Sequence, residues 1–208
     1  PAEDVAFRGG TVFNKRDPEQ AMSFSELASS AQRPELLPLG TDPGLEFQTE
    51  FTLPDNPFGF GAHVAVVEVD QETGELSFLR YAAVHDSGTV INPTLFEGQV
   101  HGALVQGLGQ ALTEVSGYSP DGQPLNSTFM DYGMPVASDT PEFKLAFMET
   151  ASPTNPLGVK GVGELPTVAA PVAVANAVMD ALSSVGADQI DTPLTPDKIW
   201  QALHGKER

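Results

Sequence analysis

Lys160-Gly161-Val162-Gly163-Glu164 is the stretch around which the rest of the chain is organised. Two glycines bracket a small apolar residue, so the backbone can turn sharply and another molecule can approach it closely. A single carboxylate follows, and Pro166 stiffens the exit towards an expected helix. Such a loop holds a lone acid or base at a fixed point, but an ordinary Gly-rich turn has the same pattern. The residues of the loop alone leave both interpretations open.

The composition indicates a globular protein with an acidic surface. The chain has 208 residues, enough for a single domain over residues 1–208 or for two small subdomains. Hydrophobic residues make up 40% and charged residues 18%. Lysine and arginine number 10 against 28 aspartates and glutamates, for a net charge of −18. Such a surface repels nucleic acid and anionic membranes, so we expect neither as a partner.

Cysteine is absent from the chain. Disulfides, cysteine-ligated iron–sulfur clusters and cysteine-based zinc sites are therefore excluded within it. No apolar run approaches the roughly 20 residues of a membrane span, and the N-terminus has no signal pattern, so we expect a cytoplasmic protein. The first residue is proline, which suggests a piece of a longer protein.

The pattern of apolar and turn-forming residues predicts an α+β fold, with a mixed sheet and packed helices. Gly9-Gly10 predicts a hairpin, and Ser23 with Glu26 predicts a capping box at the start of a short helix. The expected strands are 46–53, 63–70, 75–85 and 143–148, and the valine-rich pair 63–70 and 75–85 is expected to be a buried centre of the sheet. The expected longer helices are 92–115 and 171–182, and a last short helix is expected to begin near 195.

The helix expected after Asn92 is unusual in its glycines, each of which costs about 1 kcal/mol relative to alanine. A helix carries that cost where another helix or a ligand passes close to its backbone. Its glutamines, Gln99, Gln106 and Gln110, either line a cofactor's surroundings or satisfy buried backbone groups.

Several residues could ligate a metal or act in catalysis, but a structural role is favoured for each. His63 and His85 lie at strand ends, and Glu97 and His101 are four residues apart on one helix face. We therefore expect no metal ligand in the chain. His85-Asp86-Ser87 contains the three residue types of a hydrolase triad. Neighbouring strand residues point to opposite faces, which argues against a triad, although a hydrolase built on Ser87 stays an alternative.

A series of motifs occurs in a characteristic order and spacing along the chain. They are VVEVD at 66–70, TGE at 73–75, VHDSG at 84–88, INP at 91–93, EGQVHG at 97–102, QGLGQAL at 106–112, DY at 131–132 with Pro135, and PLGVKGVGE at 156–164. In these motifs the chain resembles the molybdenum hydroxylases of the xanthine oxidase family, in the large-subunit branch that includes aerobic carbon monoxide dehydrogenases and aldehyde oxidoreductases. Ser87 is a departure, because that family usually has cysteine there.

The resemblance implies that the chain is the C-terminal portion of a molybdopterin-binding domain. It implies an enzyme that oxidises a small carbon substrate, such as an aldehyde, an N-heterocycle or carbon monoxide, with water as the oxygen source. In that family the loop glutamate stands beside the molybdenum and acts as the general base, a role that falls on Glu164. Lys160, Gly161, Val162 and Gly163 would then contact the cofactor.

The resemblance also implies cofactors and partners. The cofactor would be molybdenum in molybdopterin, in the cytosine dinucleotide form. The partners would be the N-terminal part of the large subunit, an Fe–S small subunit and an FAD medium subunit, assembled as a dimer of heterotrimers. By itself, this chain is expected to bind no cofactor and to be inactive. The alternative is a structural or assembly module that keeps the fold without the chemistry.

Overall fold

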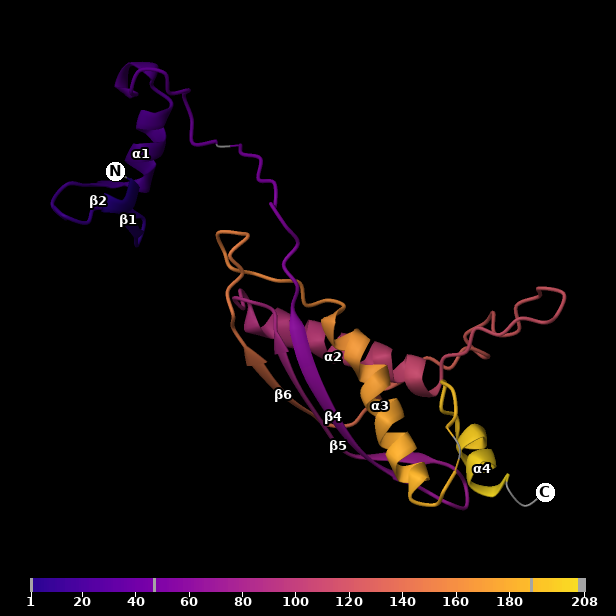
Figure 1. The fold of residues 1–208 in the computed structure, drawn as a ribbon. Coiled ribbons are helices and arrows are strands. Elements are labelled where there is room, and N and C mark those ends of the chain that lie inside the picture. The colour runs from indigo at the N-terminus through magenta and orange to yellow at the C-terminus, as the bar shows by residue number, and fades with distance from the viewer. Residues whose placement is uncertain (1, 47, 188, 206–208) are drawn as a thin grey trace. The chain divides into compact units, whose positions relative to one another are not determined.

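The chain forms two compact units in the computed structural model, Pro1–Thr52 and Leu53–Arg208 (Figure 1). The structure describes residues 2–46, 48–187 and 189–205. The motifs of the sequence from residue 66 onward all lie in the second unit. The expectation of a single domain over residues 1–208, or of two subdomains, stays a prediction.

The first unit is a small antiparallel sheet with one helix. A 3₁₀ turn, η1 (Ala2–Asp4), leads into strands β1 (Val5–Arg8), β2 (Thr11–Asn14) and β3 (Ala21–Ser23), which pair in that order. The predicted hairpin is confirmed, with Gly9 and Gly10 both at positive φ. Helix α1 (Phe24–Ala31) begins with the predicted capping box between Ser23 and Glu26. A second turn, η2 (Pro34–Leu36), follows.

The second unit is built on a three-stranded mixed sheet of order β4-β5-β6. β4 (Phe60–Val69) and β5 (Leu76–Asp86) form an antiparallel hairpin, and β6 (Phe143–Met148) runs parallel to β5. The register pairs Phe60 with Asp86, so the start of β4 lies beside the end of β5. β6 ends at this same end of the sheet, because Asp86 also pairs with Met148. The segment after β5 and the segment that leads to Glu164 both leave the sheet at this end.

Helices α2 (Pro93–Leu112) and α3 (Leu165–Ser183) pack against each other and against the sheet (Figure 1). A short turn, η3 (Ala137–Asp139), precedes β6. Helix α4 (Pro196–His204) lies against the β4–β5 turn, where a Cβ on Gly74 would collide with the carbonyl oxygen of Pro196. The core between these elements consists largely of Tyr81, Val100, Leu104, Leu108, Val174, Val178, Leu182, Leu194 and Ile199.

Four details differ from the sequence-based prediction. α2 ends at Leu112, before the expected residue 115. α3 begins at Leu165 instead of 171, because Pro166 occupies the first turn and Pro171 is accommodated inside the helix. No strand forms in the described residues of 46–53, where no partner strand is present. β4 is an edge strand with one covered face, so Val64 and Val66 are 62% and 42% exposed.

The expectation that no apolar run approaches the length of a membrane span is wrong for α3. This helix has 19 residues and a mean hydropathy of 1.5, which makes it long and apolar enough by those two measures. One side of it, however, is in the protein core through Ala170, Val174, Val178 and Leu182. Core helices of globular proteins have the same length and composition.

Gly107 explains part of the glycine content of α2. A Cβ on Gly107 would lie 2.6 Å from the Cβ of Ala170 and 3.1 Å from the carbonyl oxygen of Thr167, both on α3. Gly102 differs, because a Cβ there would meet nothing within 4 Å. The close approach that the sequence suggested is therefore confirmed at Gly107, where the approaching element is another helix.

Gly107→Ala and Gly102→Ala form a matched pair that tests this packing. Alanine is the better helix former, so Gly102→Ala should raise the free energy of unfolding by about 0.5–1 kcal/mol. The methyl group at position 107 has no room, so Gly107→Ala should be less stable than Gly102→Ala by about 1–3 kcal/mol. Urea unfolding of the two variants measures the difference. Equal stabilities would show that α3 does not press on α2 at this point.

Candidate functional site

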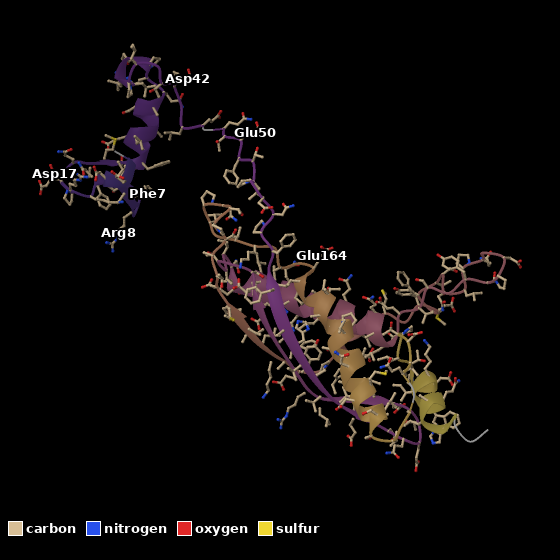
Figure 2. The ribbon with its side chains drawn as sticks, viewed as in Figure 1. Phe7, Arg8, Asp17, Asp42, Glu50 and Glu164 are labelled. Carbon is tan, nitrogen blue, oxygen red and sulfur yellow. The ribbon has the colours of Figure 1, made fainter. Side chains whose placement is uncertain are left out.

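Glu164 lies at the entrance to α3 as its N-cap residue (Figure 2). Its backbone has φ −100° and ψ −15°, and its side chain makes no capping hydrogen bond. Preferred N-cap residues turn their side chains back onto the N–H groups of the first helical turn. Glu164 does not, and it is exposed, with no partner for its carboxylate among the residues that the structure describes. The carboxylate is therefore free to contact another molecule.

The loop before Glu164 is open on one side and supported on the other. Gly161 and Gly163 are exposed, and a Cβ on Gly161 would meet nothing within 4 Å. A Cβ on Gly163 would have only the Oε1 atom of Gln99 nearby, at 3.6 Å. On the supported side, a Cβ on Gly59 would lie 3.1 Å from the carbonyl oxygen of Gly161. Val162, between the glycines, packs against the core.

Backbone hydrogen bonds hold the loop to the chain that follows β5. The N–H of Lys160 donates to the carbonyl oxygen of Ser87 at 2.8 Å, and the N–H of Thr89 donates to that of Gly158 at 3.0 Å. Between them, Gly88 and Val159 form an isolated antiparallel bridge. Gly88 has φ +66°, and a Cβ on it would collide with the carbonyl oxygen of Gly158. Glycine is therefore required at position 88.

A buried ion pair reinforces this attachment. The Lys160 Nζ atom lies 3.1 Å from Asp86 Oδ1, with the side chains 11% and 0% exposed. The Asp86 carboxylate also accepts from the backbone N–H groups of Gly88, at 2.8 Å, and Thr150, at 3.1 Å. Burial alone would raise the pKa of Asp86, but the hydrogen bonds from Thr150, Gly88 and Lys160 outweigh burial and lower the pKa to about 2. Asp86 is therefore a charged acceptor at neutral pH.

A pocket of about 300 Å³ lies beside the loop. Its lining comes from residues 87–99 and from the loop before Glu164. Ser87, Asn92, Gln99 and Lys160 are among its polar residues, and Val162 is on its apolar side. The hydroxyl of Ser87 is buried and has no hydrogen-bond partner among the described residues. An unpaired buried hydroxyl beside a pocket marks a place where a bound polar group would be stabilised.

The two histidines considered as metal ligands contact each other. The Nε2 atoms of His63 and His85 are 2.8 Å apart, and His63 Nδ1 lies 2.9 Å from the hydroxyl of Tyr81. Burial, with a smaller contribution from the nearby His85, lowers the pKa of His63 to about 4, and burial also lowers that of His85. The rings are therefore neutral at pH 7 and join β4 to β5.

The other candidates take ordinary structural roles. His101 and Glu97 form an exposed contact on α2, with 3.8 Å between Nε2 and Oε1. His85 and Asp86 are engaged by His63 and Lys160, so they do not form a triad with Ser87. Of the glutamines, Gln99 lines the pocket and Gln106 lies 3.5 Å from the Thr167 hydroxyl. Gln110 is exposed.

Sequence reasoning identified the loop but missed the partner of its lysine. Lys160 and Asp86 are 74 residues apart, and no local pattern pairs them. The only signal was that both belong to motifs of the same family resemblance. Taken together, the site offers one unpaired carboxylate on a supported loop beside a pocket with polar groups. This arrangement can accept a proton from a molecule that approaches the open side of the loop.

The chain is similar to several proteins of known function. A family model described as "Molybdopterin cofactor-binding domain" matches residues 1–141. The nicotine 6-hydroxylase large subunit of Paenarthrobacter nicotinovorans is 36% identical over 204 residues, covering 98% of this chain and 25% of that protein. The carbon monoxide dehydrogenase large chain of Hydrogenophaga pseudoflava is 38% identical over 166 residues, covering 80% of this chain and 21% of that protein.

Solved structures agree with these matches. Quinoline 2-oxidoreductase from Pseudomonas putida 86 aligns with a TM-score of 0.90 and 35% identity, covering 100% of this chain and 26% of the other. Carbon monoxide dehydrogenase from Oligotropha carboxidovorans aligns with a TM-score of 0.86 and 33% identity, covering 97% and 25%. The chain spans about a quarter of the length of the curated relatives it matches. The family resemblance based on the motifs and the α+β fold predicted from the pattern of apolar and turn-forming residues are both confirmed.

The histidine pair predicts a loss of stability in mild acid. The unfolded chain takes up protons near the ordinary histidine pKa of 6.5, whereas folded His63 does so near 4. The stability that neutral His63 contributes is therefore present above pH 6.5 and is lost as the pH falls towards 4, by about 1–3 kcal/mol. His63→Gln should flatten the decline of the free energy of unfolding over this interval.

Urea unfolding at pH 7, 6, 5 and 4 measures this effect. His204→Gln is the matched control, because His204 is exposed on α4 and should leave the slope unchanged. If the free energy of unfolding of His63→Gln declined with falling pH as steeply as that of the unsubstituted protein, His63 would not be the source of the decline.

Proposed function

The chain belongs to the family of molybdopterin cofactor-binding domains, and from this premise we propose that it is the C-terminal part of a molybdenum hydroxylase large subunit. The proposed activity is oxidation of a small carbon substrate, an aldehyde, an N-heterocycle or carbon monoxide, with water as the source of oxygen. The observation that carries the proposal is the unpaired carboxylate of Glu164 at the tip of a supported, glycine-flanked loop.

The residues around the loop fit a bound molybdopterin cofactor. A Cβ on Gly161 would meet nothing within 4 Å and one on Gly163 would meet only the end of the Gln99 side chain, so a large group can approach this backbone closely. The unpaired hydroxyl of Ser87 and the amide of Gln99 line the adjoining pocket. We propose that Gly161, Val162 and Gly163 contact the cofactor, and that Lys160 borders it while its ammonium is held by Asp86.

Glu164 is proposed as the general base. The cofactor, when bound, supplies the two-electron oxidation of the substrate carbon. A nucleophile derived from water must lose a proton to react, and a carboxylate oxygen of Glu164 accepts it. Side chains usual at an N-cap are held by the helix, whereas this carboxylate has no internal hydrogen bond to break before it takes up a proton. A positioned general base contributes about 10²–10⁴ in rate.

The remaining cofactors are proposed to reside elsewhere in the assembly. The chain has no cysteine, so it offers no thiolate ligand for an iron–sulfur cluster. Relatives are described as the large subunit or the gamma subunit of multi-subunit enzymes. We propose an Fe–S subunit and an FAD subunit as partners, and the cytosine dinucleotide form of the cofactor. The N-terminal part of the large subunit would complete the cofactor site.

A non-catalytic assembly module is the second candidate. Exposed apolar side chains on the outer face of the sheet, such as Val64, Val66 and Met148, favour contact with further protein. The two candidates differ in what they require of Glu164, because a module that only assembles does not need an unpaired carboxylate on this loop.

Glu164→Gln in the assembled enzyme distinguishes the two. Glutamine keeps the size of the side chain and removes its basicity, so kcat should fall at least about a hundredfold while molybdenum content stays unchanged. Turnover with the preferred substrate and metal analysis of the same preparation are measured together.

Glu72→Gln is the control, because Glu72 is exposed on the β4–β5 turn at the opposite end of the hairpin. It makes the same chemical change and should leave kcat as it is. Normal turnover of a fully loaded Glu164→Gln enzyme would overturn the base assignment and favour the assembly module.

A further inference from the structure

The ion pair between Lys160 and Asp86 joins two segments that the chain brings together from a distance. Asp86 is the last residue of β5, and Lys160 lies four residues before Glu164. The carboxylate is fully buried and the lysine side chain is 11% exposed. Removing two charges from water is costly, and a pair in this setting persists only with good geometry and additional hydrogen bonds. Keeping this buried pair at the start of the loop therefore costs desolvation free energy that its hydrogen bonds must offset.

Asp86 has its additional hydrogen bonds, and each comes from a segment that borders the loop. Gly88 belongs to the turn after β5, and Thr150 follows the end of β6. Together with Lys160, these donors place one carboxylate at the junction of three segments. The Lys160 ammonium also lies 5.5 Å from the ring centre of Phe60, the first residue of β4. The ammonium therefore has both an anionic and an aromatic partner.

The segment between Lys160 and Glu164 has little else to fix it. Residues 161–163 make no hydrogen bond within the part of the chain that the structure describes, and two of the three are glycines. Glycine allows a wide range of backbone conformations. Val162 gives an apolar contact, and the fixed start of α3 holds the far end. The polar attachment closest to Glu164 on the upstream side is therefore Lys160, through its backbone N–H on Ser87 and its ammonium on Asp86.

We propose that the Lys160–Asp86 ion pair is the positioning device that holds Glu164 at its working point, an inference that rests on the proposed function of Glu164. Lys160 acts through the loop, as a positioning residue. Its ammonium fixes the upstream end of a flexible three-residue segment, and α3 fixes the downstream end. Without the pair, the carboxylate of Glu164 keeps its chemistry but loses its location.

Lys160→Met tests this role in the full enzyme with its partner subunits. Methionine fills much of the lysine stem and cannot pair with Asp86. We expect kcat to fall about 10–100-fold, because a displacement of about 1 Å at a catalytic group has an effect of this order. KM should change less than about twofold and molybdenum and pterin content should be unchanged. Hydrogen–deuterium exchange should become faster in the peptide that covers residues 158–164.

Lys144→Met is the matched control, since Lys144 is exposed on β6 and the variant loses the same charge. It should leave kcat and the exchange of residues 158–164 unchanged. A Lys160→Met enzyme that is loaded, has normal kcat and shows normal exchange would overturn the proposal. Loss of molybdenum or pterin from it would also overturn the proposal, because Lys160 would then be a cofactor contact.

The double variant Lys160→Met/Glu164→Gln separates this inference from the proposed function. If Lys160 acts by placing Glu164, its substitution should slow the Glu164→Gln enzyme less than about twofold, although it slows the unsubstituted enzyme at least about tenfold. Equal effects in both backgrounds would overturn the positioning role while leaving the base assignment intact. Full activity of Glu164→Gln alone would overturn the base assignment, and the positioning role would fall with it.

Lys160→Met leaves the buried Asp86 without its cation and could prevent assembly. Asp86→Asn/Lys160→Met avoids this, because it removes both charges. This variant should assemble, carry molybdenum and show the same loss of kcat and the same faster exchange at residues 158–164. Normal kcat and normal exchange in a loaded double variant would overturn the proposal independently of the single substitution.

Discussion

The buried carboxylate of Asp86 is the interaction on which the rest of the site depends. It stands at the end of β5, beside the start of β4 and the end of β6, and accepts hydrogen bonds from the turn after β5, the residues after β6 and the loop before α3. A charge so placed is stable only while its donors stay in position. The sheet edge and the loop are therefore stabilised by a common set of bonds, and disturbing one disturbs the other.

The second constraint is the contact between α2 and α3. Gly107 lets the backbone of α2 approach Ala170 and Pro171, so the axis of α3 is fixed close to that of α2. Because Glu164 is the N-cap of α3, this packing also fixes the position of the Glu164 backbone. The loop is thus bounded by two rigid attachments, the ion pair upstream and the helix contact downstream. A glycine-rich segment that is held at both ends can be exposed to a ligand while its range of conformations stays limited.

The sequence was sufficient for the elements that are defined by local pattern. The α+β class, the central hairpin, the capping box at Ser23 and the exposed glutamate loop could all be predicted, since turn glycines, alternation and capping residues act over a few positions. The start of α3 was predicted wrongly, because either Pro166 or Pro171 can occupy the first turn of a helix. In the structure Pro166 takes that position, and Pro171 lies inside the helix beside Gly107. The His63–His85 contact depends on the register of β4 with β5, and the Asp86–Lys160 pair lies beside the bridge between Gly88 and Val159. No single segment encodes either pairing.

Two carboxylates at this edge of the sheet illustrate how environment divides roles. Asp86 is fully buried and its hydrogen bonds lower its pKa to about 2, so it stays charged and cannot serve as a proton acceptor near neutral pH. Glu164 is exposed and its carboxylate accepts no hydrogen bond from the described part of the chain, so the carboxylate oxygens are available. The hydrogen-bonded Asp86 carboxylate therefore fixes the geometry of the site, and the unpaired Glu164 carboxylate supplies its reactivity. If both carboxylates were unpaired, a proton acceptor would exist without a fixed position. If both were paired, a fixed position would exist without a proton acceptor.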